Sequence, residues 1–148
     1  MTRAADVERS VTIARTPDEV RAFVLDAERI MEWQRRLREY EQLTPGPPGL
    51  GTQARGVAAV RGELWEWTAE IVEWDEAGWR WKSVISNPRW QMRWDLEPVD
   101  DGTRVTVRNW SPALSHIAAI AFRRSAAEQA ERELLRLRWL LEAAAPSR

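Results

Sequence analysis

Apolar and polar residues alternate along three consecutive segments in the middle of the chain. A period of two is that of a β-strand, so each segment has one face for water and one apolar face. The apolar face is mostly indole, and each tryptophan carries roughly 150–250 Å² of surface that must be covered. Another element of the fold or a flat apolar ligand is expected to cover it. The large side chains on this face are Trp65, Trp67, Trp79, Trp81, Trp90, Met92 and Trp94.

The N-terminal part of the chain predicts a strand followed by helices. Residues 7–14 alternate between apolar and polar side chains, as expected for a first strand. Thr16 then suits a helix N-cap, with Pro17 at the first helical position and Glu19 completing a capping box. A second short helix is expected over residues 27–36.

A loop rich in proline and glycine, residues 44–51, separates these helices from a run of strands. Short turns join one strand to the next, which predicts an antiparallel meander of hairpins. The register of the first strand in this run stays open, but its face of small residues, which includes Ala54 and Gly56, favours inward packing and leaves Arg55 outside. The strands are expected at residues 52–61, 63–74, 79–86, 89–97 and 104–110.

One long helix is predicted from Ser111 to about Ala144, because Ser111 and Pro112 suit a helix start and no further proline or glycine follows up to residue 144. A break near residues 115–116 is compatible with the pattern. The apolar stripe is small in its middle and large at its ends, so the helix either packs tightly against the indoles or leaves a cavity. Both alternatives stay open. The stripe consists of Ala119, Phe122, Ala126, Ala130, Leu134, Leu137 and Leu141.

The order of these elements resembles the helix-grip fold of the START-like superfamily, also called SRPBCC or Bet v 1-like, and within it the polyketide cyclase/dehydrase group. The resemblance implies an α+β fold in which a curved antiparallel sheet wraps around a long C-terminal helix, with two short helices after the first strand. It covers nearly the whole chain and implies one domain over residues 1–148. The segments that carry it are residues 11–13, 16–20, 26–29 with Trp33, 49–52, 101–105 and 141–142.

Within that group the chain is similar to bacterial aromatic-polyketide aromatase/cyclases. The shared features are Trp33 with Tyr40 seven residues later, the sequence Trp65-Glu66-Trp67, and Pro88 with Met92 four residues later. The resemblance implies that the tyrosine and a strand arginine face the cavity and steer cyclisation and dehydration of a poly-β-ketone. Tyr40 matches that tyrosine, but Ile71 stands where the arginine would be. The cation of the family's site is therefore missing at its usual position.

Three polar residues are candidates for catalysis, and two for ligand binding. Tyr40 is a candidate general acid, with a packed aromatic as the alternative. His116 is the only histidine, and histidine changes charge most readily near neutral pH; a surface or packing role is its alternative. Arg55 could replace the missing arginine only in the opposite strand register. Ser83 and Asn109 lie on the tryptophan face, where they could bind a ligand carbonyl or hydroxyl or accept buried indole N–H groups.

Composition excludes several classes of function. The chain has 22 basic and 23 acidic residues and a formal net charge of −1, so no electrostatic footprint for nucleic acid or an anionic membrane is present. No cysteine, metal-ligand spacing or phosphate loop occurs, and no metal or cofactor is expected. Without a signal-like start or a run of about 20 apolar residues, a cytoplasmic protein with no membrane span is expected.

These features predict a protein that binds a hydrophobic, aromatic or polyketide-like small molecule in a Trp-lined cavity. The cavity would fold a poly-carbonyl chain so that one carbon–carbon bond forms in preference to others. The protein would thereby direct cyclisation or aromatisation in the biosynthesis of natural products such as antibiotics. The expected partners are that ligand and a carrier protein that delivers a polyketide, and both a monomer and a homodimer are compatible with the sequence. The alternative is a non-catalytic carrier or chaperone of a lipid, quinone or other hydrophobe. A protein–protein module is less favoured, because the outer face has mixed charge and lacks an apolar patch.

Overall fold

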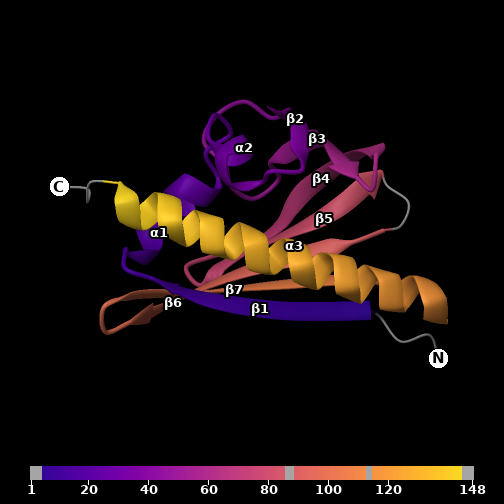
Figure 1. The fold of residues 1–148 in the computed structure, drawn as a ribbon. Coiled ribbons are helices and arrows are strands. Elements are labelled where there is room, and N and C mark those ends of the chain that lie inside the picture. Colours follow the sequence, from indigo (N-terminus) through magenta and orange to yellow (C-terminus); the bar gives the residue numbers. More distant parts are fainter. Residues whose placement is uncertain (1–4, 86–88, 113–114, 145–148) are drawn as a thin grey trace.

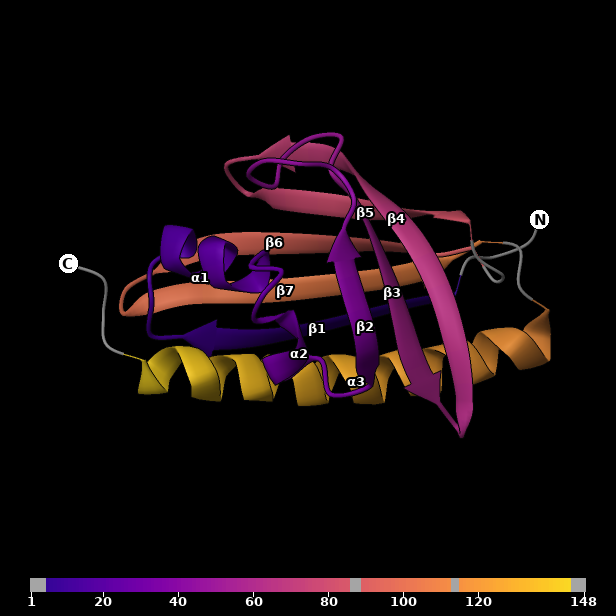
Figure 2. The ribbon, with the colours of Figure 1, turned by 90° about the horizontal axis from the view of Figure 1, so that it is seen from above.

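The structure, a computed structural model, describes residues 5–85, 89–112 and 115–144. Seven antiparallel strands form one sheet in the order β1-β7-β6-β5-β4-β3-β2, and the long helix α3 lies across it (Figure 1). The sheet curls, so that β2, β3 and β4 run steeply across the direction of β6 and β7 (Figure 2). The expected helix-grip architecture is confirmed. The elements are β1 (Ala5–Ile13), α1 (Pro17–Val24), α2 (Ile30–Trp33), β2 (Leu37–Gln42), β3 (Gln53–Val60), β4 (Glu63–Asp75), β5 (Gly78–Ile85), β6 (Gln91–Val99), β7 (Gly102–Ser111) and α3 (His116–Ala143).

Helix α1 begins where the sequence predicts, and its first turn has the expected capping box. The Thr16 hydroxyl accepts the backbone N–H of Glu19 at 3.2 Å, and the Glu19 carboxylate accepts the backbone N–H of Thr16 at 3.4 Å. These two bonds satisfy N–H groups that a helix start leaves without partners. The helix then buries Val20, Phe23 and Val24 against the core.

The second helix is much shorter than predicted. A helix was expected over residues 27–36, but α2 covers only Ile30–Trp33, and the missed strand β2 follows and pairs with β3. The physical reason is that Ile30, Trp33 and Leu37 have helix-like spacing, yet Leu37 reaches the interior from a strand with a bulge beside it. Pairing with β3 supplies backbone hydrogen bonds that the local pattern does not reveal.

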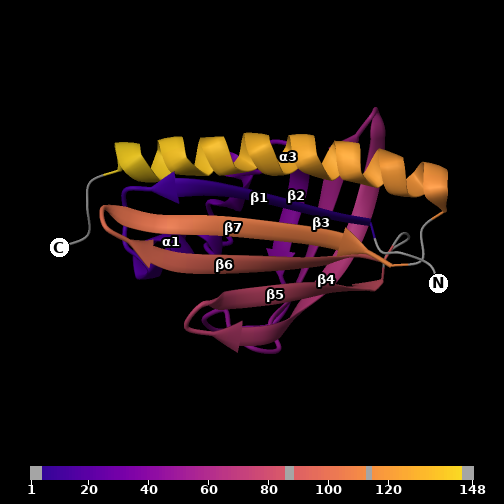
Figure 3. The ribbon, with the colours of Figure 1, turned by 90° about the horizontal axis from the view of Figure 1, so that it is seen from below.

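The C-terminal helix begins later than predicted. Ser111 is the buried last residue of β7, and its hydroxyl donates to the carbonyl of Arg89. The N-cap of α3 is Ser115, whose hydroxyl accepts the backbone N–H of Ala118 at 3.2 Å. Helix α3 runs beside β1 (Figure 3), where Arg9 pairs with Glu131 at 2.8 Å. The predicted turn at residues 87–88, with Pro88, lies outside the described residues.

The outer face of the sheet is charged, as the alternation predicts. Arg93 lies at the centre of an ion-pair cluster, with its guanidinium 3.0 Å from Asp95, 3.2 Å from Asp75 and 3.4 Å from Glu73. The same cluster includes Arg80, which is 3.1 Å from Glu73. The charged side chains occupy this outer face, and most of the indoles of the central strands therefore lie on the opposite, concave face. The concave face holds the hydrophobic core and the cavity.

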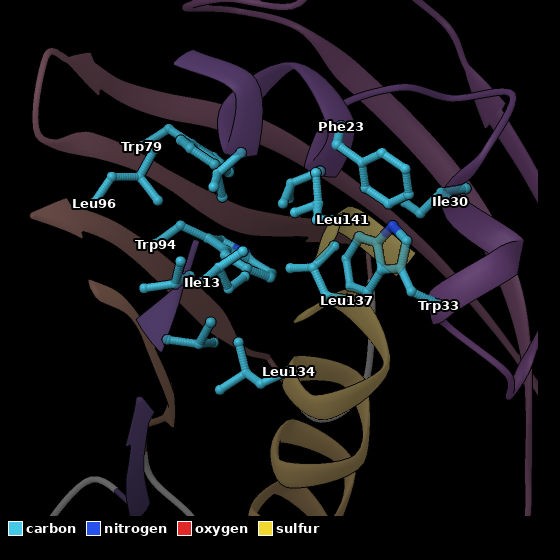
Figure 4. Packing of buried hydrophobic residues seen from close by; sticks show 14 of the residues in the cluster. Ile13, Phe23, Ile30, Trp33, Trp79, Trp94, Leu96, Leu134, Leu137 and Leu141 are labelled. Atoms are coloured by element: carbon cyan, nitrogen blue, oxygen red, sulfur yellow. The ribbon is translucent and has the colours of Figure 1, made fainter. Parts of the chain in front are cut away.

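The filled part of the core lies at the C-terminal end of α3. There the helix carries large residues, and Leu137 and Leu141 pack against Trp79, Trp94 and the side chains of α1 and α2 (Figure 4). The ring of Trp79 stacks on that of Trp94, with centroids 5.7 Å apart and planes 8° apart. Trp33 meets the same Trp94 edge-on at 5.7 Å. This cluster fixes the indole positions at one side of the cavity described next.

Candidate functional site

A cavity of about 280 Å³ lies between the concave face of the sheet and α3. It exists because the apolar stripe of α3 is small where it crosses this part of the sheet: Ala126 and Ala130 line the cavity, whereas Leu137 and Leu141 fill the core further along. Of the two alternatives that the sequence left open, the structure contains a cavity beside a filled core. The lining includes Leu25, Ile30, Trp33, Arg36, Leu37, Tyr40, Ala58, Val60, Trp65, Trp67, Trp81, Trp90, Met92, Trp94, Val107, Asn109, Phe122, Ala126, Gln129, Ala130, Glu133 and Leu134.

Most of the predicted binding residues line this cavity, and two do not. Trp79 has no exposed surface and lies in the core, stacked on Trp94. Ser83 is buried in β5, where its hydroxyl accepts the backbone N–H of Trp90 at 3.0 Å. The structure therefore gives both a packing or hydrogen-bonding role away from the cavity. The predicted residues that it brings together are Trp65, Trp67, Trp81, Trp90, Met92, Trp94 and Asn109.

Trp67 is the centre of an aromatic cluster in the cavity wall. Its ring meets that of Trp90 edge-on at 5.9 Å and that of Tyr40 at 6.0 Å with a tilt of 55°. Gly56 on the paired strand β3 lies under this ring, and a Cβ there would be 2.6 Å from Cε2 of Trp67. Glycine at this position thus lets the indole lie flat against the strand.

We expect Gly56→Ala to destabilise the fold by about 1–3 kcal/mol, the usual cost of overpacking. Trp90 and Tyr40 flank Trp67, so its ring can make room for the added methyl group only by moving into the cavity, away from its packed position. Denaturant unfolding measures this loss. The control is Ala59→Gly on the same strand, outside the cavity lining, which should leave ligand access unchanged. A Gly56→Ala variant as stable as the wild type would contradict the packing described.

Tyr40 reaches the cavity from β2, as the family resemblance implies. Burial raises the pKa of its phenol to about 12, because the ionised form would be poorly solvated there. At neutral pH the side chain is therefore an uncharged phenol. It can donate a hydrogen bond to a ligand oxygen. It cannot serve well as a general base at neutral pH, because almost none of it is in the phenolate form.

The other two catalytic candidates do not line the cavity. Arg55 points to the outer face of the sheet, where its guanidinium is 3.3 Å from Glu66 and 3.7 Å from Glu41. This is the register that the small face of the strand favours. His116 is exposed at the first turn of α3. The structure thus does not bring Tyr40, Arg55 and His116 together.

Sequence reasoning missed a polar group on the cavity wall. Glu133 and Gln129 line it from α3, and Arg36 lines it from the turn between α2 and β2. A signal was present: Glu133 lies three residues after Ala130 and four before Leu137, which is the spacing of the apolar stripe. Leu134, which is also buried, fits the same stripe and conceals this signal.

Burial raises the pKa of Glu133 to about 7. Desolvation of the carboxylate is the main cause, and it outweighs the hydrogen bond from Gln129 and the positive charge of Arg36, which both lower the pKa. Glu133 is therefore a cavity residue whose charge changes near neutral pH. Its carboxyl group can exchange a proton or bind a polar group of a ligand in that range.

Within the described residues, no group of three or more His, Cys, Asp or Glu side chains is placed to hold a metal ion. In the same part of the chain, no helix is both long and apolar enough to cross a bilayer.

Comparison with solved structures finds the same fold in other proteins. A protein from Thermus thermophilus has a TM-score of 0.76 and 24% identity, with 95% of this chain and 99% of that chain covered. The ZhuI aromatase/cyclase from a Streptomyces species has a TM-score of 0.76 and 16% identity, with 95% and 94% covered. A START superfamily protein from Mycobacterium smegmatis has a TM-score of 0.80 and 16% identity, with 93% and 97% covered. At these identities the similarity to the three proteins is a similarity of fold.

Comparison of the sequence itself identifies the family. No curated protein sequence matches the chain significantly. A family model described as polyketide cyclase / dehydrase and lipid transport matches residues 4–141, which is nearly all of the chain. With this match and the START-like fold, the chain belongs to the polyketide cyclase/dehydrase and lipid transport family.

Proposed function

We propose that this protein binds a flat hydrophobic small molecule, aromatic or polyketide-like, in the cavity between the sheet and α3. The observation that carries the proposal is the concentration of indole around the cavity: six of the ten tryptophans line it. Indole faces stack on flat rings and cover apolar surface in one contact. The family, which combines polyketide cyclases with lipid transport proteins, supports a hydrophobic ligand.

The volume of the cavity limits the size of the ligand. A cavity of about 150 Å³ can bind one benzene ring. The cavity here is about 280 Å³, just below the range of about 300–1,000 Å³ that is typical of sites for drug-sized ligands. Its size therefore favours a molecule of roughly two or three fused rings, or a short folded chain of similar bulk.

Directed cyclisation or aromatisation in natural-product biosynthesis is the finer form of this proposal. The shared fold with the ZhuI aromatase/cyclase supports it, as does the place of Tyr40 in the cavity wall. The chemistry would rest on shape: a narrow apolar cavity holds a poly-carbonyl chain in one folded conformation, so that one carbon–carbon bond forms in preference to others. Tyr40 would donate a hydrogen bond to a carbonyl oxygen that gains negative charge.

A non-catalytic carrier of a hydrophobic molecule is the second candidate. The separation of the titratable residues favours it, because Arg55 is engaged with Glu41 and Glu66 on the outer face and His116 lies outside the lining. Ile71, at the position of the family's arginine, is fully buried and adds no charge. A carrier needs only the cavity and its apolar wall.

Tryptophan fluorescence tests the binding proposal, because several emitters lie in the cavity wall. We expect flat aromatic compounds of two or three rings to quench or shift the emission at micromolar concentration. Single-ring compounds of matched polarity serve as the control and should bind more weakly. A broad panel that leaves the emission of the folded protein unchanged would remove the main support for the proposal.

Product analysis separates the cyclase from the carrier. If the protein directs cyclisation, adding it to a reactive poly-β-ketone thioester mimic changes the ratio of cyclised products. Tyr40→Phe, which removes only the hydroxyl, should then reduce that change, whereas His116→Ala should retain it because His116 does not line the cavity. An unchanged product ratio with the wild type, together with tight binding, gives first place to the carrier.

A further inference from the structure

Two charged side chains interrupt an otherwise uncharged cavity wall. Among the described residues that line the cavity, these are Glu133 on α3 and Arg36 in the turn before β2. An ionised carboxylate against an apolar space loses most of its hydration, which is costly unless other groups compensate. A carboxyl group contributes nothing to the packing of an apolar core, so the place of Glu133 beside the cavity indicates that its carboxyl group has a hydrogen-bonding partner.

Gln129 connects the two charged residues. Its side-chain oxygen accepts a hydrogen bond from Nη1 of Arg36 at 3.5 Å, and its side-chain nitrogen donates to Oε1 of Glu133 at 2.9 Å. Nη1 of Arg36 also donates to the hydroxyl of Ser125 at 3.5 Å. The second carboxyl oxygen of Glu133, Oε2, has no hydrogen-bond partner among the described residues. The hydrogen bonds from Arg36 to Gln129 and from Gln129 to Glu133 thus orient the carboxyl group of Glu133 and leave one of its oxygens free to accept a hydrogen bond beside the cavity.

We propose that Glu133 selects and orients the ligand by accepting a hydrogen bond from a hydroxyl group on its aromatic ring system. The inference rests on the proposed binding function and adds the chemical class of the ligand: a hydroxylated aromatic rather than a pure hydrocarbon. The indoles supply stacking for any flat ring, so they do not discriminate among rings of one size. Glu133, held by Gln129, supplies the discrimination, because a ligand without a donor leaves Oε2 of the carboxylate without a hydrogen bond.

The charges around Glu133 favour an acceptor role. Arg36 faces it from the turn before β2, and Tyr40 on β2 is the other titratable side chain in the described lining; the remaining strands contribute none. Both Arg36 and the Gln129 hydrogen bond lower the pKa of Glu133 against the effect of burial. A ligand hydroxyl that donates to Oε2 acts in the same direction. Binding should therefore shift Glu133 toward the carboxylate and release protons near neutral pH.

The test compares two probes of matched size, 2-naphthol and 2-methylnaphthalene. We expect the wild type to bind 2-naphthol on the order of tenfold more tightly at pH 8, the value of a hydrogen bond to a charged group. This preference should shrink at pH 5.5, where Glu133 is protonated. Calorimetry near pH 7 in two buffers of different ionisation enthalpy should show proton release with 2-naphthol and none with 2-methylnaphthalene.

Glu133→Gln tests the residue and Glu128→Gln is the matched control. The first variant keeps the shape and should lose the preference for 2-naphthol, its pH dependence and the proton release. Glu128 is an exposed residue on the same helix, so its variant should behave as the wild type. If Glu133→Gln retains the full preference, or the wild type binds both probes equally, the inference is overturned while the binding function stands. If neither probe binds, the proposed function itself fails.

Discussion

Trp79→Ala is expected to destabilise the protein by about 3–5 kcal/mol, the usual cost of truncating a buried tryptophan. Trp79 has no exposed surface and stacks on Trp94, and its loss leaves a void beside Trp94 in the buried cluster. Ligand affinity should change much less, because Trp79 does not line the cavity. Urea unfolding gives the stability, and a titration under conditions where the variant remains folded gives the affinity.

Trp81→Ala is the matched control, two residues away on the same strand. Trp81 lines the cavity and is only partly buried. We therefore expect the opposite order of effects: a smaller loss of stability, since part of its surface already faces empty space, and a larger loss of affinity for a flat aromatic probe. Similar losses of stability and affinity in the two variants would contradict the division of the tryptophan face into core and cavity.

This division shows how far the sequence determines the site. The period of two places Trp79 and Trp81 on one face of the sheet, and the structure confirms that face. It does not say which of the two meets α3 and which meets a void. That depends on the curl of the sheet and on bulges in the β4–β5 pairing, beside Ala69 and between Ile71 and Glu73. Both are products of long-range pairing.

The helical part of the fold shows the same limit. Local signals located α1, because Thr16 and Glu19 satisfy backbone N–H groups of the first turn without any tertiary contact, and Pro17 has no N–H to satisfy. Strand β2 has no such local signal, since its hydrogen-bond partner β3 lies beyond a loop of prolines and glycines. Tyr40 was expected at the cavity from the family resemblance. The structure adds that β2 is the element that brings it there.

Glu133 escaped prediction for a related reason. On a helix wheel it is a polar residue beside the apolar stripe, and most such residues are solvated. Its environment is fixed by Arg36, which is distant in the chain and reaches α3 only when β2 has paired with the sheet. The electrostatic character of the cavity is therefore a property of the tertiary structure.

The pH dependence of stability provides an independent measure of that environment. Burial raises the pKa of Glu133 from 4.5 to about 7, so between these values the folded protein holds a proton that the unfolded chain has lost. Stability then falls as the pH rises through this window. The penalty is fully developed above pH 7 and amounts to at most about 3 kcal/mol. Below pH 4.5 both states are protonated and the penalty vanishes.

Glu133→Gln removes this penalty while keeping the side-chain volume. We expect the variant to be more stable than the wild type by up to about 3 kcal/mol at pH 8, with the difference shrinking steadily toward pH 4.5. Groups that titrate elsewhere contribute equally to both proteins and cancel in the difference, and Tyr40, with its pKa raised to about 12, does not titrate in this window. Urea unfolding at several pH values measures this difference in stability for the wild type, Glu133→Gln and the exposed control Glu128→Gln. A difference that is constant with pH would mean that Glu133 is solvated in the folded protein, and the polar group of the cavity would lose its role.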